Sequence, residues 1–178
     1  AQIVFGPGTV LTETNQGAGN YVVRVGGEGS RFSATGATLD ASGEAIDSAV
    51  IRVSNRAELH LGEGTRVIGN ADGVELVDTR ATIDRVTIST TQARPDADGI
   101  VIDGGTVEMK DSTVTAGSGS AVSFIHASGT SAGTASVSGG SLASGTGAAI
   151  TSSVYRITQQ GNMTPTGFGS VPCERLEV

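Results

Sequence analysis

The chain has 178 residues and a formal net charge of −7 at pH 7, with 27 glycines and no tryptophan. Its mean hydropathy is near zero, so the composition argues against a membrane-spanning protein and against a highly charged disordered tail. The acidic balance also argues against a nucleic-acid partner, because phosphate binding needs a basic surface. We expect one folded domain with a core of Val, Ile, Leu and Ala.

The predicted elements are short β-strands, and no segment shows the periodicity of a substantial helix. Apolar residues alternate with polar ones in several segments, as they do in strands that bury one face. In chain order these segments are Tyr21 to Val25, Val50 to Val53, Glu58 to Leu61, Val74 to Val77, Ala81 to Ile83, Ile100 to Ile102, Val107 to Met109, Val122 to Ile125 and Val154 to Ile157. Turns rich in Gly, Asn and Asp separate them.

An internal repeat connects these strands. Val107, Met109, Val114 and Val122 align with Ala135, Val137, Leu142 and Ile150 at one constant offset, with Gly, Ser and Thr between them. At a slightly shorter offset, Ala81, Ile83 and Ile88 align with Val107, Met109 and Val114. A unit of this length, with several short strands and glycine turns, is typical of a β-solenoid.

The repeat extends toward the amino terminus with a shorter period again. Val50 to Val53 align with Val74 to Val77, and the same alignment stacks Arg56 on Arg80. The sequence therefore predicts an all-β solenoid of about six turns, with periods of roughly 22 to 28 residues.

The extent of the repeat divides the chain into three parts. We expect residues 20–158 to form the solenoid and residues 1–19 to cap its first turn. Residues 159–178, where the repeat fades, would form a C-terminal cap or the boundary of a fragment. An exposed terminal turn is an open sheet edge, which is why caps are expected at both ends.

Charged residues offer few candidates for a site. Most arginines alternate with apolar residues and so point outward from strands, but an Arg56 and Arg80 ladder is a candidate surface contact for an anion or a glycan. The single cysteine, Cys173, cannot form an internal disulfide or a metal cluster. Neither histidine has a nucleophile placed in a familiar motif. The residues therefore predict no catalytic site and no cofactor.

One acidic stretch is the only candidate for a metal site. Asp96, Asp98 and Asp103 carry the oxygen ligands that calcium prefers, although their spacing does not match a known calcium loop. The repeat places Asp72 one turn from Asp98, and each of these two precedes a glycine. Because Asp before Gly is what a turn ordinarily requires, a structural turn is the competing interpretation.

Several segments of the repeat share a degenerate pattern, which covers about two thirds of the chain. They are the openings Gly-Val-Glu-Leu at Gly73 and Gly-Ile-Val-Ile at Gly99, and the segments 81–88, 107–114 and 135–142. With these segments the chain resembles an autotransporter passenger domain of the pertactin type. The resemblance implies a right-handed parallel β-helix, secreted or held at the surface of a Gram-negative bacterium and exported by an outer-membrane β-barrel.

The same resemblance implies a role in adhesion or virulence, with a host cell-surface protein or glycan as partner. It also implies that the chain is a fragment of a longer passenger. We therefore expect a non-catalytic protein that acts by surface adhesion.

Two other classes of function remain open. Pectate lyases, polygalacturonases and phage tailspike depolymerases resemble this architecture, and their chemistry needs clustered carboxylates for acid–base work or for calcium. A purely structural stalk is the third class, although six turns at a strand spacing of about 4.8 Å rise only about 29 Å. A groove with converging carboxylates and a basic residue would favour the enzyme. A smooth face of Ser, Thr and isolated charges would favour adhesion or scaffolding.

Overall fold

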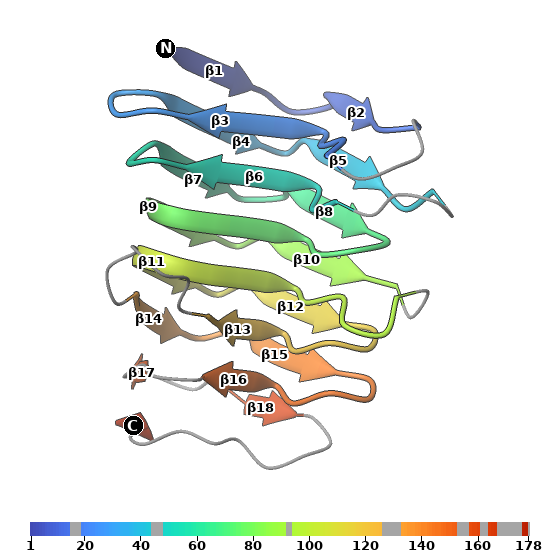
Figure 1. The fold of residues 1–178 in the computed structure, drawn as a ribbon, viewed down its shortest axis with the longest axis vertical. Helices are drawn as coiled ribbons and strands as arrows, with labels where there is room; N and C mark the ends of the chain where they lie inside the picture. The colour runs from blue at the N-terminus through green and yellow to red at the C-terminus, as the bar shows by residue number, and fades with distance from the viewer. Residues whose placement is uncertain are drawn as a thin grey trace.

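The computed structural model describes residues 1–14, 19–43, 48–91, 94–125 and 133–152, and the backbone of three short strands beyond them. Every regular element in these residues is a β-strand, and each strand pairs in parallel with an equivalent strand of a neighbouring turn (Figure 1). Cys173 and His126 lie outside the described residues.

Each turn contributes strands to three faces. Face 1 contains β3 (Val23–Gly26), β6 (Ile51–Ser54), the first part of β9 (Val74–Asp84), the first part of β11 (Ile100–Lys110), β13 (Val122–Phe124) and β16 (Ile150–Ser152). Face 2 contains β1 (Gln2–Phe5), β4 (Arg31–Thr35), β7 (Glu58–Gly62), the second parts of β9 and β11, β14 (Thr134–Ser138), β17 (Ile157–Gln160) and β19 (Leu176–Glu177). Face 3 contains β2 (Val10–Thr12), β5 (Thr38–Ala41), β8 (Arg66–Gly69), β10 (Thr87–Thr90), β12 (Thr113–Ala116), β15 (Ser141–Ser144) and β18 (Thr164–Thr166).

This topology is a right-handed parallel β-helix of about 5 turns, which confirms the predicted fold class. The expected number of about six is approached if the incomplete turns at the two ends are included. At the N-terminal end, β1 and β2 pair with β4 and β5, so part of the expected cap at 1–19 is itself a partial turn. At the C-terminal end, β17, β18 and β19 continue the parallel pairing into residues 159–178.

The register of the second half agrees with the repeat. Val107 pairs with Ala135 and Met109 with Val137, as the alignment of the two copies predicts. The alignment of the preceding copy is also confirmed, because Ala81 and Ile83 pair with the same two residues of β11.

The predicted register of the first half is wrong. The repeat aligns Val50 with Val74 and Arg56 with Arg80, whereas in the structure Val74 pairs with Ile51 and Arg80 with Glu58. The register also shifts between the two strands, because residues 55–57 turn the corner after β6, whereas only residues 78–79 turn the same corner inside β9.

The core is a set of apolar stacks that run along the helix axis. On face 2 one stack contains Phe32, Leu59, Ala81, Val107 and Ala135, and on face 3 another contains Leu39, Val67, Ile88, Val114 and Leu142. All of these side chains are buried, and most are fully covered. Their neighbours along each strand point outward, since side chains alternate between the two sides of a strand.

Two of the three corners use left-handed backbone conformations in the turns that the structure describes. Between faces 1 and 2 these include Arg56 and Gly105, with φ of 62° and 87°, and between faces 2 and 3 they include Arg85 and Gly140, with φ of 53° and 75°. A side chain on Gly105 would drive its Cβ into the backbone of Thr79 in the preceding turn. Glycine is required there because stacked corners bring two backbones into contact.

Buried hydroxyl groups connect the corners of successive turns. Thr65 Oγ1 donates to the carbonyl oxygen of Ala34, and Thr79 Oγ1 donates to that of Val53, both at 3.1 Å. Ser112 Oγ accepts the backbone N–H of Val86 at 3.1 Å. These bonds join each corner to a backbone group of a neighbouring turn.

Candidate functional site

Charged side chains form a column on the outward side of face 2. The register places Arg31, Glu58, Arg80, Thr106 and Thr134 at equivalent positions in successive turns. Arg31 donates to Glu58 Oε2 at 2.5 Å between adjacent turns, and this hydrogen bond lowers the pKa of Glu58. Arg80, next in the column, makes no ion pair with any described residue.

Two further columns lie beside it. The first contains Ser33, His60, Thr82, Glu108 and Ser136, and the second contains Asp84, Lys110 and Ser138. His60 Nε2 lies 3.7 Å from Glu58 Oε2, which links the first column to its neighbour. Toward the C-terminal end, hydroxyls replace the charges, and Thr134 Oγ1 donates to Thr106 Oγ1 at 3.4 Å.

Three hollows follow face 2 along the axis. The first, of about 480 Å³, lies beside Gln2, Arg31 and Glu58. The second, of about 270 Å³, is lined by Arg56, Glu58, Asp78, Thr79, Arg80, Gly105 and Thr106. The third, of about 330 Å³, is lined by Thr82, Asp84, Glu108, Met109, Lys110, Ser136 and Ser138. Together they extend from β1 to β14 and are lined mainly by charged and hydroxyl side chains.

The predicted stacking of Arg56 on Arg80 is wrong. The register places Glu58 beside Arg80, whereas Arg56 lies at the corner with φ of 62° and donates its backbone N–H to the carbonyl oxygen of Asp78. Arg56 Nε also lies 3.8 Å from a carboxylate oxygen of Asp78. The two arginines nevertheless line the same hollow, because the corner brings Arg56 to its rim.

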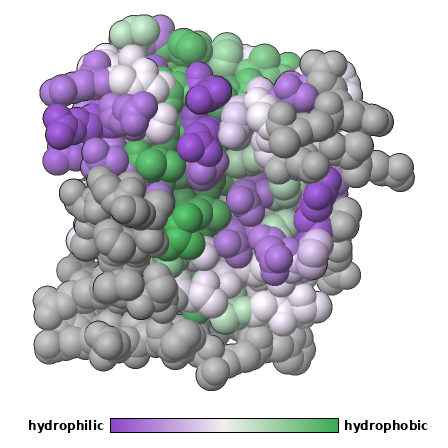
Figure 2. All heavy atoms as spheres, viewed as in Figure 1, coloured by the Kyte–Doolittle hydropathy of each residue, from purple (hydrophilic) through white to green (hydrophobic). Residues whose placement is uncertain are grey.

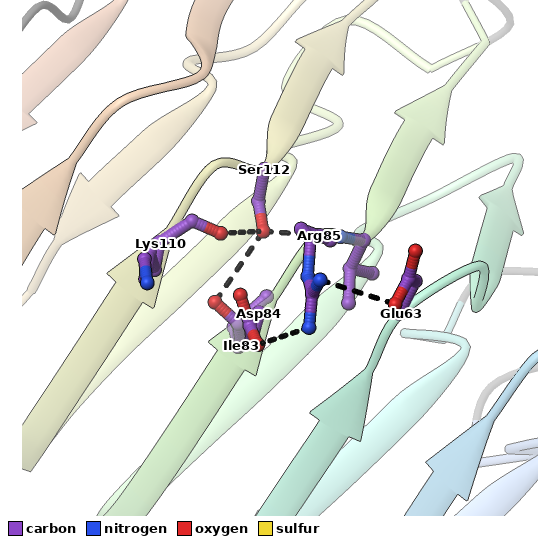
Figure 3. Close-up of polar contacts among 7 residues, drawn as sticks. Glu63, Ile83, Asp84, Arg85, Lys110 and Ser112 are labelled. Atoms are coloured by element: carbon purple, nitrogen blue, oxygen red, sulfur yellow. Dashed lines mark hydrogen bonds and ion pairs between the residues drawn. The ribbon is translucent and has the colours of Figure 1, made fainter.

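The corner between faces 2 and 3 carries a second group of charges (Figure 3). Arg85, which has a left-handed backbone conformation, lies between Glu63 and Asp84 and pairs with both carboxylates, at 3.1 Å and 3.2 Å. Figure 3 also shows Ser112 beside Lys110, to whose carbonyl oxygen its hydroxyl donates at 2.8 Å. This corner therefore holds Asp84 at the edge of the third hollow.

The three predicted metal ligands do not form a site. Asp98 precedes β11 and Asp103 lies further along this extended strand, so about 16 Å separates them. Asp96 is exposed, whereas Asp103 is buried at the far end of face 1. No group of three or more His, Cys, Asp or Glu in the described ranges is placed to hold a metal ion.

Asp72 and Asp98 instead form a ladder at the corner between faces 3 and 1. Asp72 Oδ1 accepts the backbone N–H of Asp98 at 2.8 Å, and Asp98 Oδ1 accepts that of Ser120 at 2.6 Å. Burial raises the pKa of Asp98 and raises the pKa of Asp72 to about 6. The predicted stacking of these two residues is confirmed, and each carboxylate accepts a backbone N–H of the next turn.

Face 1 differs in character from face 2. Figure 2, which views the molecule from the side of face 1, shows apolar side chains gathered along its middle with hydrophilic side chains on both sides. Near its N-terminal end the ring of Tyr21 lies within 6 Å of the guanidinium groups of Arg24 and Arg52, at 5.8 Å and 5.9 Å.

No helix that could cross a membrane is found in the part of the chain that the structure describes.

The hollow at Asp84, Glu108 and Lys110 was not predicted as a site. The repeat carried the necessary signal, because the alignment that matches Ala81 with Val107 also matches Asp84 with Lys110. However, no pattern in the sequence distinguishes these outward side chains from the ordinary solvated positions of a solenoid.

No protein-family model matches the chain, and no curated protein or solved structure matches it at a significant level. The structure itself therefore defines the class of protein, which is a parallel β-helix built from a repeated three-stranded turn. One fold supports many unrelated functions, so the function depends on the side chains that the surface exposes, which on face 2 are mainly charged and hydroxyl groups.

Proposed function

We propose that this chain is a non-catalytic binding module of a secreted or surface-exposed protein of a Gram-negative bacterium, similar to an autotransporter passenger domain. It acts in adhesion, and its partner is a glycan or protein of a host cell surface. In the full-length protein an outer-membrane translocator exports it.

The observation that supports binding is the row of three hollows along face 2. From β1 to β14 the row crosses five strand spacings, or about 24 Å. An extended ligand that lies along the axis contacts several turns at once. Because these contacts belong to one ligand, each of them raises the overall affinity even if it is weak alone. Charged and hydroxyl groups in the row suit a polar polymer or an extended peptide.

A matched pair of arginines tests this surface. Arg80 lies on face 2 and Arg66 on face 3, and both are exposed and without an ion pair to any described residue. We expect Arg80→Ala to weaken binding of the labelled chain to cultured epithelial cells and to immobilised matrix proteins or glycans, while Arg66→Ala leaves binding unchanged. Equal effects of the two substitutions would contradict the assignment to face 2. Absence of binding by the unmodified chain would leave the stalk as the better explanation.

A second candidate function is polysaccharide cleavage, which the third hollow favours. Asp84 and Glu108 line it together with Lys110, so two carboxylates and a basic residue meet on one face. The register makes the two residues diagonal neighbours, and a strand spacing of about 4.8 Å with a rise of about 6.6 Å over two residues places their Cα atoms about 8 Å apart. Inverting glycosidases hold their carboxyl groups about 6.5–9.5 Å apart. A depolymerisation screen on soluble polysaccharides separates the two functions, since reducing ends appear only if the chain is an enzyme.

A further inference from the structure

The third hollow of face 2 has the size of a site for a single small unit. Its volume of about 330 Å³ is at the lower end of the range for pockets that bind small molecules. Outward side chains around it are spaced by about 4.8 Å between strands and about 6.6 Å along a strand. These spacings place several polar groups within reach of one ligand group of that size.

Asp84 lacks a hydrogen-bond donor for one of its oxygens. Its Oδ2 pairs with Arg85 Nη2 at 3.2 Å, whereas its Oδ1 is covered and has no partner. An unpaired carboxylate oxygen is unfavourable, and a donor that enters the hollow would satisfy it. The torsion about the Cβ–Cγ bond of an aspartate is broad, so a partial rotation turns the carboxylate and presents an oxygen to a donor in the hollow.

The other groups of the hollow both accept and donate. Glu108 accepts, Lys110 donates, and the hydroxyls of Ser136 and Ser138 do either. A ligand that matches this set carries donors and acceptors on adjacent atoms, as the hydroxyls of a sugar ring do. Two carboxylates against one ammonium make the hollow net negative, which disfavours a carboxylated or sulfated sugar.

We propose that this hollow is a subsite for one neutral sugar unit of a glycan chain, with Asp84 as its principal acceptor. The proposal rests on the proposed function, because it names the ligand class for one part of face 2. A hydrogen bond to an ionised carboxylate is about twice as strong as one between neutral groups, so Asp84 carries more of the affinity than the serines do.

The test uses the biotinylated full chain on immobilised neutral, uronic-acid and sulfated glycans. We expect the unmodified chain to bind neutral glycans. Asp84→Asn should lower the affinity about tenfold or more, which corresponds to about 1.4 kcal/mol, and Ser138→Ala should lower it by a smaller factor. The controls on face 3 are Asp40→Asn and Thr115→Ala, which we expect to bind like the unmodified chain. Circular dichroism and thermal melting establish that each variant is folded, and Ser138→Ala keeps the proposal testable if Asp84→Asn does not fold.

The outcomes separate the two proposals. Neutral-glycan binding that Asp84→Asn and Ser138→Ala leave unchanged overturns the subsite and leaves binding along face 2 intact. Preference for the uronic-acid or sulfated glycans overturns the neutral ligand class. If the chain binds cells or matrix proteins but no glycan, the subsite is overturned and the proposed adhesion stands. Absence of all binding overturns both.

Discussion

Substituting Asp72 by Asn should stabilise the protein at neutral pH. Asp72 lies at the corner before β9, where burial, together with the nearby charges of Asp98, Glu75 and Asp96, raises the pKa of its carboxyl to about 6. The backbone N–H of Asp98 opposes this shift by donating to the carboxylate. Asn keeps an oxygen that can accept this N–H but carries no charge, so the substitution removes the unfavourable burial of a carboxylate.

The direction and size of the effect follow from proton linkage. The pKa of Asp72 is about 6 in the folded protein against an ordinary value of 3.8, a difference of about two units that corresponds to about 3 kcal/mol. Because the folded state binds the proton more tightly, this contribution to stability is fully present below pH 3.8 and is lost as the pH rises through 6. From this group alone, we expect the free energy of unfolding to be about 1.4 kcal/mol larger at pH 5 than at pH 8.

Urea unfolding followed by circular dichroism at pH 5 and pH 8 measures this effect. Asp72→Asn should raise the free energy of unfolding at pH 8 by up to about 3 kcal/mol, and it should reduce by about 1.4 kcal/mol the gain in stability that the unmodified protein shows between pH 8 and pH 5. Asp40→Asn on face 3 serves as the control for loss of one negative charge. An Asp72→Asn protein that is no more stable than the unmodified one at pH 8 would refute the burial argument.

Three further predictions test the fold by the same urea assay. Gly105→Ala should destabilise by about 3 kcal/mol or more, because of its positive φ and the collision with Thr79, whereas Gly8→Ala, with φ of 81° and open space, should lose only about 1–2 kcal/mol. Similar losses would contradict the close approach. Ser112→Ala should lose about 1–3 kcal/mol by leaving the N–H of Val86 without its acceptor, and no loss would show that another group accepts it. Leu59→Ala should lose about 2–5 kcal/mol from the core, and a smaller loss would indicate that the stack collapses around the gap.

The second half of the fold could be predicted from the sequence because its turns have nearly constant length. Val114 pairs with Leu142, and Val122 with Ile150, as the two copies of the repeat align them. Inward positions in a solenoid must stay apolar, so matching them between copies recovers the register directly. The stacked Asp72 and Asp98 follow from the same reasoning, since their turns are equivalent.

The first half could not be aligned in this way because its corners differ in length. Asn55 and Arg56 both adopt left-handed conformations and lengthen one corner by a residue, which the pattern of apolar residues does not reveal. In a strand, a shift of one residue moves a side chain to the opposite face. The predicted pairing is one residue off at Val74 and two residues off at Arg80, whose neighbour is Glu58 and not Arg56, while the overall fold class is unaffected.

The candidate site was only partly accessible from the sequence for a related reason. Hollows depend on the relative heights of outward side chains in three successive turns, as at Asp84, Lys110 and Ser138. Sequence patterns constrain the inward positions, whose chemistry must be apolar, but leave the outward positions free. Asp96, Asp98 and Asp103 appeared as a cluster because they are close in sequence, yet an extended strand carries Asp103 away from the other two.

This freedom of the outward positions also explains why face 2 can serve a function without weakening the fold. The inward stack beside Phe32 and Leu59 stays apolar, while the outward column changes from Arg31 to Glu58 to Arg80 in successive turns. Exposed ion pairs such as that between Arg31 and Glu58 contribute little to stability, so substitutions in this column should cost little folding energy. Loss of binding after substitution of such an exposed side chain, with an unchanged circular dichroism spectrum and melting temperature, therefore reports a lost contact and not an unfolded chain.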